Sequence, residues 1–176
     1  MRCILVLVLV ALSFVSPAPT RNNLKEDLTK LANETTILYE RAILKCHIIA
    51  CQKAVDNKNN KQTDIEKVQM YLNKLVDWDE TWPKNAHKFS VEKMEGSTNI
   101  FVNIPSDTLN NLVNGGLSEI NLKCDELRTQ VLDGFEARAT EIIRSYREAG
   151  YTDAKMDEWY NKFLQNRESE IFALLA

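Results

Sequence analysis

Apolar residues recur at intervals of three and four positions over most of this chain, and few residues interrupt the pattern. One series starts at Leu24, keeps that spacing through Leu38 and, with one lapse at Lys45, ends at Ile49. Such a spacing places apolar side chains on one face of an α-helix. The 176 residues include only 5 glycines and 4 prolines, less than half of the roughly 12% that an average chain has. The sequence therefore predicts an all-α protein with long helices.

Four main helices and one short helix follow from the pattern. We expect them over 23–57, 63–82, 106–114, 117–149 and 152–174. Thr63 and Thr152 can cap two of these helices, and Gly150 ends the fourth. Residues 84–105 lack a helical pattern, and we expect an irregular segment there. The first and fourth helices would each be about 50 Å long. These lengths fit an elongated antiparallel helical bundle, with residues 84–114 folded over the end that the shorter helices leave bare.

Residues 1–18 have the build of a secretory signal peptide. Arg2 precedes an apolar run of about a dozen residues, and small residues and prolines follow it. The run is shorter than the ~20 apolar residues that a membrane span needs; an N-terminal anchor or a buried strand is the alternative interpretation. No later stretch is long and apolar enough to span a membrane. We expect cleavage between Ser16 and Thr20, which leaves 19–176 as a single secreted, extracellular helical domain.

The mature chain would keep three of the four cysteines, because Cys3 leaves with the signal peptide. An odd number in an oxidising compartment implies one disulfide bond and one spare thiol, or a bond between two chains. Cys46 and Cys51 are five positions apart in one predicted helix, a rise of about 7.5 Å that exceeds the ~6.8 Å limit between bridged Cα atoms. Cys124 is therefore the expected partner of one of them.

Antiparallel packing of the first and fourth helices would place Cys51, late in one, near Cys124, early in the other. We therefore favour a Cys51–Cys124 disulfide, with Cys46–Cys124 as the alternative. In the favoured pairing Cys46 is the spare thiol. Its apolar neighbours in the sequence favour a buried, unreactive thiol and a monomeric protein. An exposed Cys46 would instead give a disulfide-linked homodimer.

Residue sets for catalysis or metal binding are missing from the sequence. His47 and His87 are the only histidines, and no cysteine or histidine has the spacing of a zinc site such as C-x-x-C or H-E-x-x-H. The Glu-x-x-His pairs of di-iron bundles, a G-x-S-x-G nucleophile turn and a glycine-rich phosphate loop are also missing. We therefore expect no enzyme activity, no metal and no cofactor.

An acidic and aromatic run, DWDETWP at 77–83, is the candidate partner-binding surface. Tryptophan is enriched among the residues that dominate binding energies at interfaces, and the run borders the irregular segment. We expect a contact surface that includes Trp78, Trp82, Phe89 and Phe101. The alternative interpretation is that the two tryptophans simply cover the core at a helix end.

One motif predicts a covalent modification. Asn33-Glu34-Thr35 is the only acceptor sequence for N-linked glycosylation in the chain. Asn33 falls opposite the apolar face of the first helix, so a glycan would point into solvent. We expect a glycoprotein modified at this position.

The function follows from the export signal, the large helical scaffold and the missing catalytic groups. Together they favour a secreted, non-enzymatic protein that binds an extracellular protein or a cell-surface partner. The combination resembles small secreted effector or salivary-type proteins of invertebrates, which implies a signalling modulator or a host-directed effector. The formal net charge of −3 argues against nucleic acid as a partner. The alternative function is transport of a small hydrophobic ligand between the helices, with residues such as Tyr71 and Phe135 lining the cavity.

Overall fold

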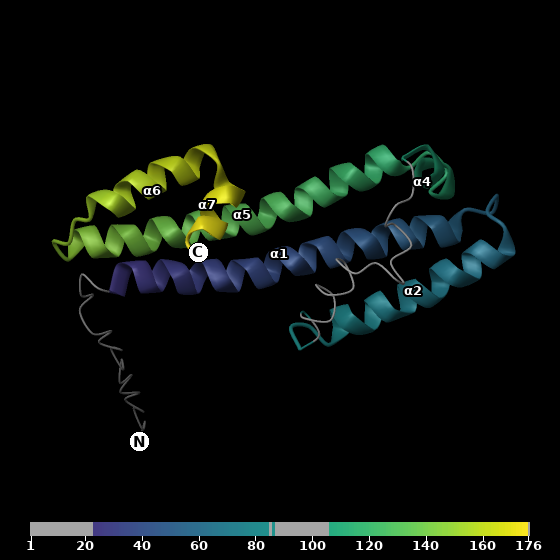
Figure 1. The fold of residues 1–176 in the computed structure, drawn as a ribbon, viewed down its shortest axis with the longest axis horizontal. Coiled ribbons are helices and arrows are strands. Elements are labelled where there is room, and N and C mark those ends of the chain that lie inside the picture. Colours follow the sequence, from purple (N-terminus) through teal and green to yellow (C-terminus); the bar gives the residue numbers. More distant parts are fainter. Residues whose placement is uncertain (1–22, 85, 87–105, 176) are drawn as a thin grey trace, which may run out of the picture.

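The structure is a computed structural model that describes residues 23–84, 86 and 106–175 (Figure 1). Its helices are α1 (Asn23–Asp56), α2 (Gln62–Glu80), α4 (Ser106–Leu112), α5 (Leu117–Glu148), α6 (Ala154–Gln165) and α7 (Arg167–Ala173). The described part of the chain contains no strand, which confirms the all-α class. Most of the segment expected to be irregular, 84–105, lies outside the described residues.

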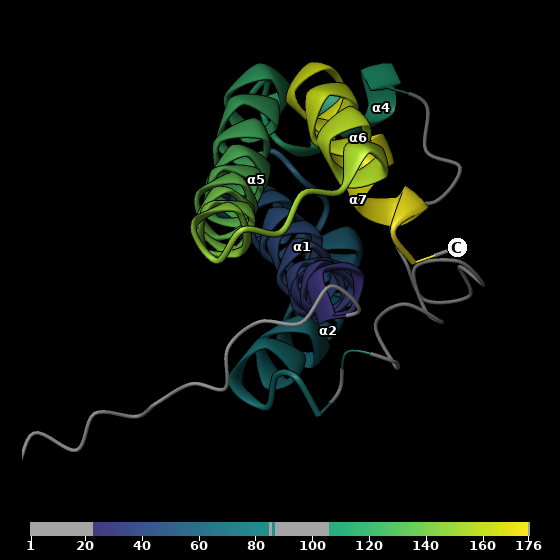
Figure 2. The same ribbon diagram turned by 90° about the vertical axis from the view of Figure 1, so that its left-hand side faces the viewer.

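The two longest helices, α1 and α5, lie side by side and antiparallel along the molecule (Figure 1, Figure 2). Arg138 donates a 2.8 Å hydrogen bond to Glu34, and Lys53 pairs with Glu119 nearer the other end. Nineteen residues separate Glu34 from Lys53, and nineteen separate Glu119 from Arg138. The two helices therefore keep one register between these contacts.

The remaining helices are arranged differently from the expected bundle. α2 lies along the C-terminal half of α1, where Arg41 donates a 2.7 Å hydrogen bond to Asp79. α6 lies beside the C-terminal half of α5, at the opposite end of the molecule (Figure 1). With 19 and 12 residues, α2 and α6 are about 28 and 18 Å long, too short to overlap along α1. The four main helices do not run side by side, so the expected bundle is not confirmed.

Two separate hydrophobic cores result from this arrangement. The first joins the N-terminal half of α1, the C-terminal half of α5, α6 and α7, and it buries Leu28, Phe135 and Phe163 completely or nearly so. The second joins the C-terminal half of α1, α2 and the start of α5, and it buries Leu44 and Leu75 completely. Each core lies under the short helices at its own end of the α1–α5 pair.

The expected last helix is in fact two helices. Asn166 adopts a non-helical backbone (φ −145°, ψ 69°) between α6 and α7, and the guanidinium of Arg167 then donates a 2.6 Å hydrogen bond to Asp133 of α5. The cap of α6 is Asp153 rather than Thr152, because its carboxylate accepts hydrogen bonds from the backbone N–H groups of the next turn at 3.0 and 3.4 Å. α7 therefore turns back over α1 and α5 instead of extending α6.

Candidate functional site

The structure places Trp78 inside the second core. Its side chain is 6% exposed, and the ammonium of Lys74 lies 4.8 Å from the centre of its ring. Trp82 is half-buried and packs against the same core. Phe89 and Phe101 lie outside the described residues. Trp78 therefore presents little surface to a partner, which favours the alternative interpretation for this residue, while the wider contact surface stays a prediction.

The residues considered for a carrier cavity are not gathered around one space. Tyr71 belongs to the second core and Phe135 to the first. A cavity beneath α7, lined by Tyr39, Leu132 and Phe172, holds only about 10 Å³, which is no more than one water needs. The carrier function therefore gains no support from these positions and stays a prediction.

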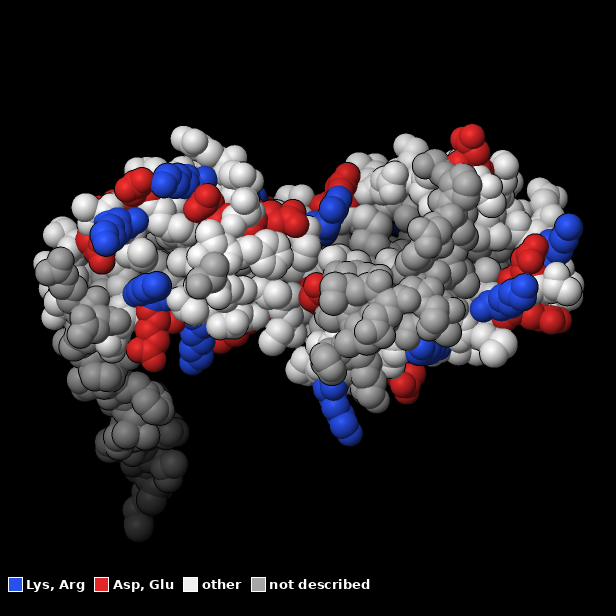
Figure 3. Space-filling view, in the orientation of Figure 1, with Lys and Arg blue, Asp and Glu red and all other residues white. Residues whose placement is uncertain are grey.

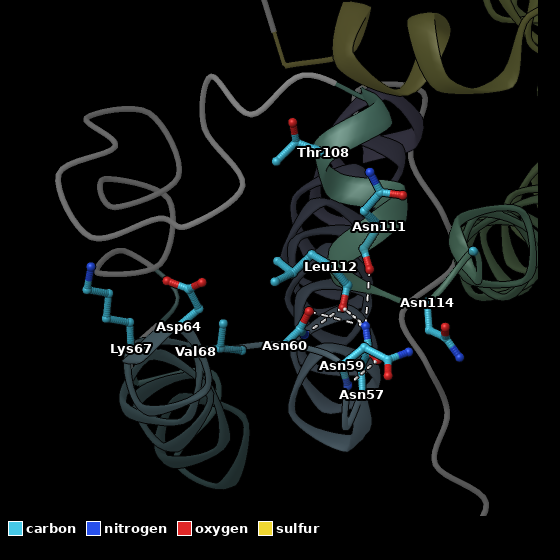
Figure 4. Close-up of a pocket in the computed structure, with 11 residues that line it drawn as sticks. Asn57, Asn59, Asn60, Asp64, Lys67, Val68, Thr108, Asn111, Leu112 and Asn114 are labelled. Carbon is cyan, nitrogen blue, oxygen red and sulfur yellow. Dashed lines mark hydrogen bonds between the residues drawn. The ribbon is translucent and has the colours of Figure 1, made fainter. Parts of the chain in front are cut away.

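A pocket of about 760 Å³ lies between α2, the α1–α2 turn and α4, and asparagines dominate its lining (Figure 4). The amide of Asn57, which is 6% exposed, donates to the carbonyls of Asn111 and Leu112 at 3.1 Å each. Asn60 donates to Ala54 and Leu112 at 2.7 and 2.8 Å. These amides already have backbone partners, so their role is to hold the α1–α2 turn against α4.

A second hollow, which we call the central groove, runs between the middle of α1 and the middle of α5. It holds about 330 Å³. Leu38 and Val131 line it, whereas their neighbours Tyr39 and Leu132 line the small cavity beneath α7. Adjacent residues point about 100° apart around a helix, so the central groove opens on a different side of the helix pair from the one that α7 covers. Figure 2 shows α6 and α7 together on one side of α1 and α5.

Apolar side chains form the floor of the central groove. Leu38, Ala42, Leu127, Val131 and Phe135 contribute to it, and the side chain of Leu38 is 48% exposed. Leu38 belongs to the apolar series of the first predicted helix, and Val131 is an apolar residue of the helix predicted over 117–149. Only residues of α1 and α5 line the central groove among the described residues. No third helix of the described chain covers these apolar side chains, which we call the open apolar seam.

Three basic residues border the central groove, namely Arg41, Lys45 and Arg138, and none of the described residues that line it is acidic. Arg41 is neutralised by Asp79 and Arg138 by Glu34. Lys45 forms no ion pair with any residue in the described ranges. Elsewhere, Figure 3 shows basic and acidic side chains interspersed over the face it displays. The central groove is thus an apolar site with a positive edge.

Gly134 lies in the middle of α5 and lines the same groove. A Cβ atom built on it would meet nothing within 4 Å among the described residues. Glycine inside a helix costs about 1 kcal/mol relative to alanine. Neither the packing nor the backbone of the described chain requires glycine here, and the missing side chain leaves the groove deeper than alanine would.

Sequence reasoning did not identify the central groove, although two signals pointed to it. Lys45 was the one lapse in the spacing of the first series, and Gly134 was the one glycine inside the helix predicted over 117–149. Each departs from what a helix in a closed core requires. Both residues line the same hollow.

The three described cysteines are thiols in this structure. Cys46 is half-buried, and burial, with a smaller effect of the neighbouring Cys124, raises the pKa of its thiol to about 12. Cys51 is completely buried, and burial raises its pKa to about 12 as well. No two of the described cysteines lie at the distance of a disulfide bond, so neither expected pairing is confirmed. Cys51 lies within the second core, and Cys124 packs against the same core.

Asn33 is exposed on α1, so a glycan there would extend into solvent, as expected; the modification itself stays a prediction. Within 23–84 and 106–175, no cluster of three or more His, Cys, Asp or Glu side chains is arranged to hold a metal ion. None of the helices in these ranges has the length and apolar character needed to cross a bilayer. The chain matches no protein-family model, no curated protein and no solved structure.

Proposed function

We propose that this is a secreted, non-enzymatic protein that binds another protein, and that an amphipathic α-helix of that partner docks in the central groove. The observation that carries the proposal is the open apolar seam. Leu38 remains 48% exposed at a position where the sequence continues the apolar series. A third helix laid along α1 and α5 would bury this surface in the way that helix-in-groove complexes do.

The chemistry of the groove specifies the docking helix. Gly134 removes a side chain where the backbone of a partner helix would approach, as small residues do at close helix crossings. Lys45, with no ion pair in the described chain, would form an ion pair with a carboxylate of the partner. The expected partner helix therefore has apolar residues at intervals of three and four and an acidic residue beside them.

The chain's own segment 84–105 fits the groove less well. It carries Lys84, Lys88 and Lys93 against two glutamates, so its net charge repeats the sign of the groove instead of complementing it. A second copy of the chain or a small hydrophobic ligand are the other possible occupants, and the experiment below separates them from a different protein.

Export is part of the proposal. The signal peptide at 1–18, glycosylation at Asn33 and one disulfide bond would all be acquired on the secretory route. The exposed position of Asn33 is compatible with glycosylation.

The test compares four forms of the tagged protein, exported by cells that express the whole chain: wild type, Leu38→Glu, Lys45→Glu and Met70→Glu. Met70 is 75% exposed on α2 and lies away from the groove, so it is the matched control. Each form is incubated with extracellular fluid and with intact cells of the source organism. Captured proteins are identified by mass spectrometry, and the purified candidate is titrated against all four forms.

We expect one protein to be captured by wild type and by Met70→Glu, with its affinity lowered at least tenfold by Leu38→Glu and by Lys45→Glu. Equal capture by the groove variants would place the contact elsewhere. Self-association of wild type that Leu38→Glu abolishes would identify a second copy as the occupant. A lipid released on native extraction would favour the carrier function, and absence from the medium would contradict export.

A further inference from the structure

The connection between α4 and α5 holds the only Asn-Gly sequence of the chain, Asn114-Gly115. Asn114 has a φ of 54° and Gly115 a φ of 75°, so both lie in the left-handed region that glycine and asparagine tolerate best. The N–H of Gly115 donates a 2.7 Å hydrogen bond to the carbonyl of Asn110, and the N–H of Asn114 donates one of 3.1 Å to the carbonyl of Asn111. These two bonds form a Schellman motif, which caps the end of α4.

The side chain of Asn114 is available to react. Asn114 and Gly115 are both exposed, and the side-chain amide of Asn114 makes no hydrogen bond with any of the described residues (Figure 4). Gly115 has no side chain to hinder the approach of another group to its own nitrogen. Solvent can therefore reach both reacting groups, and the hydrogen bond to Asn110 is what restrains the nitrogen of Gly115 in the described structure.

We propose that Asn114 is a deamidation site and that the cap at the end of α4 slows the reaction in the folded protein. The backbone nitrogen of Gly115 loses its proton to a base in the solvent and forms a bond to Cγ of Asn114. The bond from Cγ to the side-chain nitrogen breaks, and this nitrogen leaves as ammonia. Water then opens the five-membered imide at either of its carbonyls, which gives aspartate or isoaspartate at position 114. Because the nitrogen must first leave Asn110, the reaction follows local opening of the cap.

Isoaspartate would prevent the cap from forming again. Its main chain runs through the former side chain and gains one carbon before Gly115, so the ring that Gly115 closes with Asn110 cannot keep its geometry. Asn57 also holds α4, by hydrogen bonds to the carbonyls of its last residues, Asn111 and Leu112. A helix of 7 residues is not stable without such contacts. The reaction would therefore loosen α4 from the α1–α2 turn, whatever occupies the central groove.

The experiment ages protein purified from cells, or from the medium of cells, that express the whole chain. The protein is kept at mildly alkaline pH in heavy-oxygen water, with and without urea, and is then digested with trypsin. The tryptic peptide 94–123 contains Asn114 together with Asn110, Asn111 and Asn121. Fragmentation of this one peptide therefore compares the sites with each other and distinguishes isoaspartate from aspartate.

Three variants are aged in parallel. Asn57→Ala removes two hydrogen bonds that hold α4. Asn73→Ala changes an exposed asparagine of α2 and is the matched control. Asn114→Gly keeps a residue suited to the left-handed region but has no amide to lose. Circular dichroism verifies that each variant folds.

We expect Asn114 to react before any other asparagine of 94–123, with a gain of about 1 Da in ordinary water and more in heavy-oxygen water. Urea should speed the reaction by at least about tenfold, because it opens the cap. Asn57→Ala should speed it in the folded protein, and Asn73→Ala should leave it unchanged. The isoaspartate form, separated by ion exchange through its added negative charge, should exchange the amide hydrogens of α4 faster than fresh wild type and aged Asn114→Gly do.

Earlier reaction at another asparagine of the peptide, or an Asn114 that stays intact in urea, would overturn the assignment of the site. Equal rates with and without urea would overturn the protective role of the cap. Unchanged hydrogen exchange in α4 of the isoaspartate form would overturn the structural consequence. If Asn57→Ala fails to fold, wild type with and without urea still decides whether the cap protects Asn114.

Discussion

The hydroxyl of Tyr146 donates a 2.8 Å hydrogen bond to a carboxylate oxygen of Asp27, 119 residues earlier in the chain. Tyr146 is in the last turns of α5 and 3% exposed, and Asp27 is near the start of α1. This bond fixes the end of the helix pair that lies farthest from the α1–α2 turn. It gives the first prediction.

Tyr146→Phe should lower the free energy of unfolding by about 1 kcal/mol, the usual net contribution of one hydrogen bond. The ring would keep its packing in the first core, so the loss would report the hydroxyl alone. Tyr151→Phe is the control, because Tyr151 is a neighbouring half-buried tyrosine whose ring centre lies 6.2 Å from that of Tyr146. Urea unfolding measures both; equal effects of the two changes would contradict the assignment.

The second prediction concerns alkaline pH. Burial, and then the hydrogen bond to Asp27, raise the pKa of Tyr146 to about 12. The unfolded chain releases this proton near its ordinary pKa of about 10, whereas the folded protein retains it. The contribution of Tyr146 to stability is therefore fully present below pH ~10 and is lost as pH rises toward 12. Tyr146→Phe should flatten the decline in unfolding free energy between these values, and an unchanged slope would be inconsistent with the raised pKa.

The third prediction separates the two interpretations of the tryptophans. Because Trp78 is 6% exposed in the second core, Trp78→Ala should cost roughly 3 kcal/mol of stability, as other large-to-small core substitutions do. Met70→Ala, on the exposed side of the same helix, should change stability by less than about 0.5 kcal/mol. Thermal and urea unfolding measure both variants. If Trp78→Ala left stability intact and only weakened partner binding, the ring would be a contact residue instead.

The fourth prediction uses two glycines with opposite requirements. Gly134→Ala should raise the free energy of unfolding by about 0.5–1 kcal/mol, because alanine favours the helix and a Cβ atom meets nothing within 4 Å. Gly150, which follows α5, has a φ of +83°, so Gly150→Ala should lower it by about 1 kcal/mol. If the partner helix docks on Gly134, the first variant should bind it more weakly while folding more stably. Tighter binding by Gly134→Ala would be incompatible with that contact.

Much of the architecture was predictable from local sequence. The apolar series defined α1 and α5 closely, because a spacing of three and four is tied directly to the helical repeat. The break at Asn166 could not be predicted from the sequence, because Phe163 and Ile171, the buried residues on either side of it, keep a helical spacing. The expected bundle needed one uninterrupted last helix along the helix pair, and the break at Asn166 shortens that helix to α6.

The candidate site was less predictable for a different reason. A groove forms where no further helix packs over a pair of helices. The position of each helix depends on helix lengths and turns over the whole chain, which local sequence patterns do not give. The argument that Cys46 and Cys51 cannot bond to each other needed only helical geometry. The level of Cys124 along α1 depends on the register of the two helices, which ion pairs such as Lys53–Glu119 reveal.

Because the two cores are separate, the two ends of the molecule can differ in their free energy of local unfolding. Both cores use α1 and α5, but they have no buried residue in common. We therefore expect that the short helices at one end can unfold while the apolar contacts at the other end remain. Cooperative units of this kind can open at different free energies in one protein. A helix seated at the middle, or a covalent bond between α1 and α5, would transmit the stability of one end to the other. Binding of a helix in the central groove would then slow amide hydrogen exchange in both α2 and α6, which lie at opposite ends of the molecule.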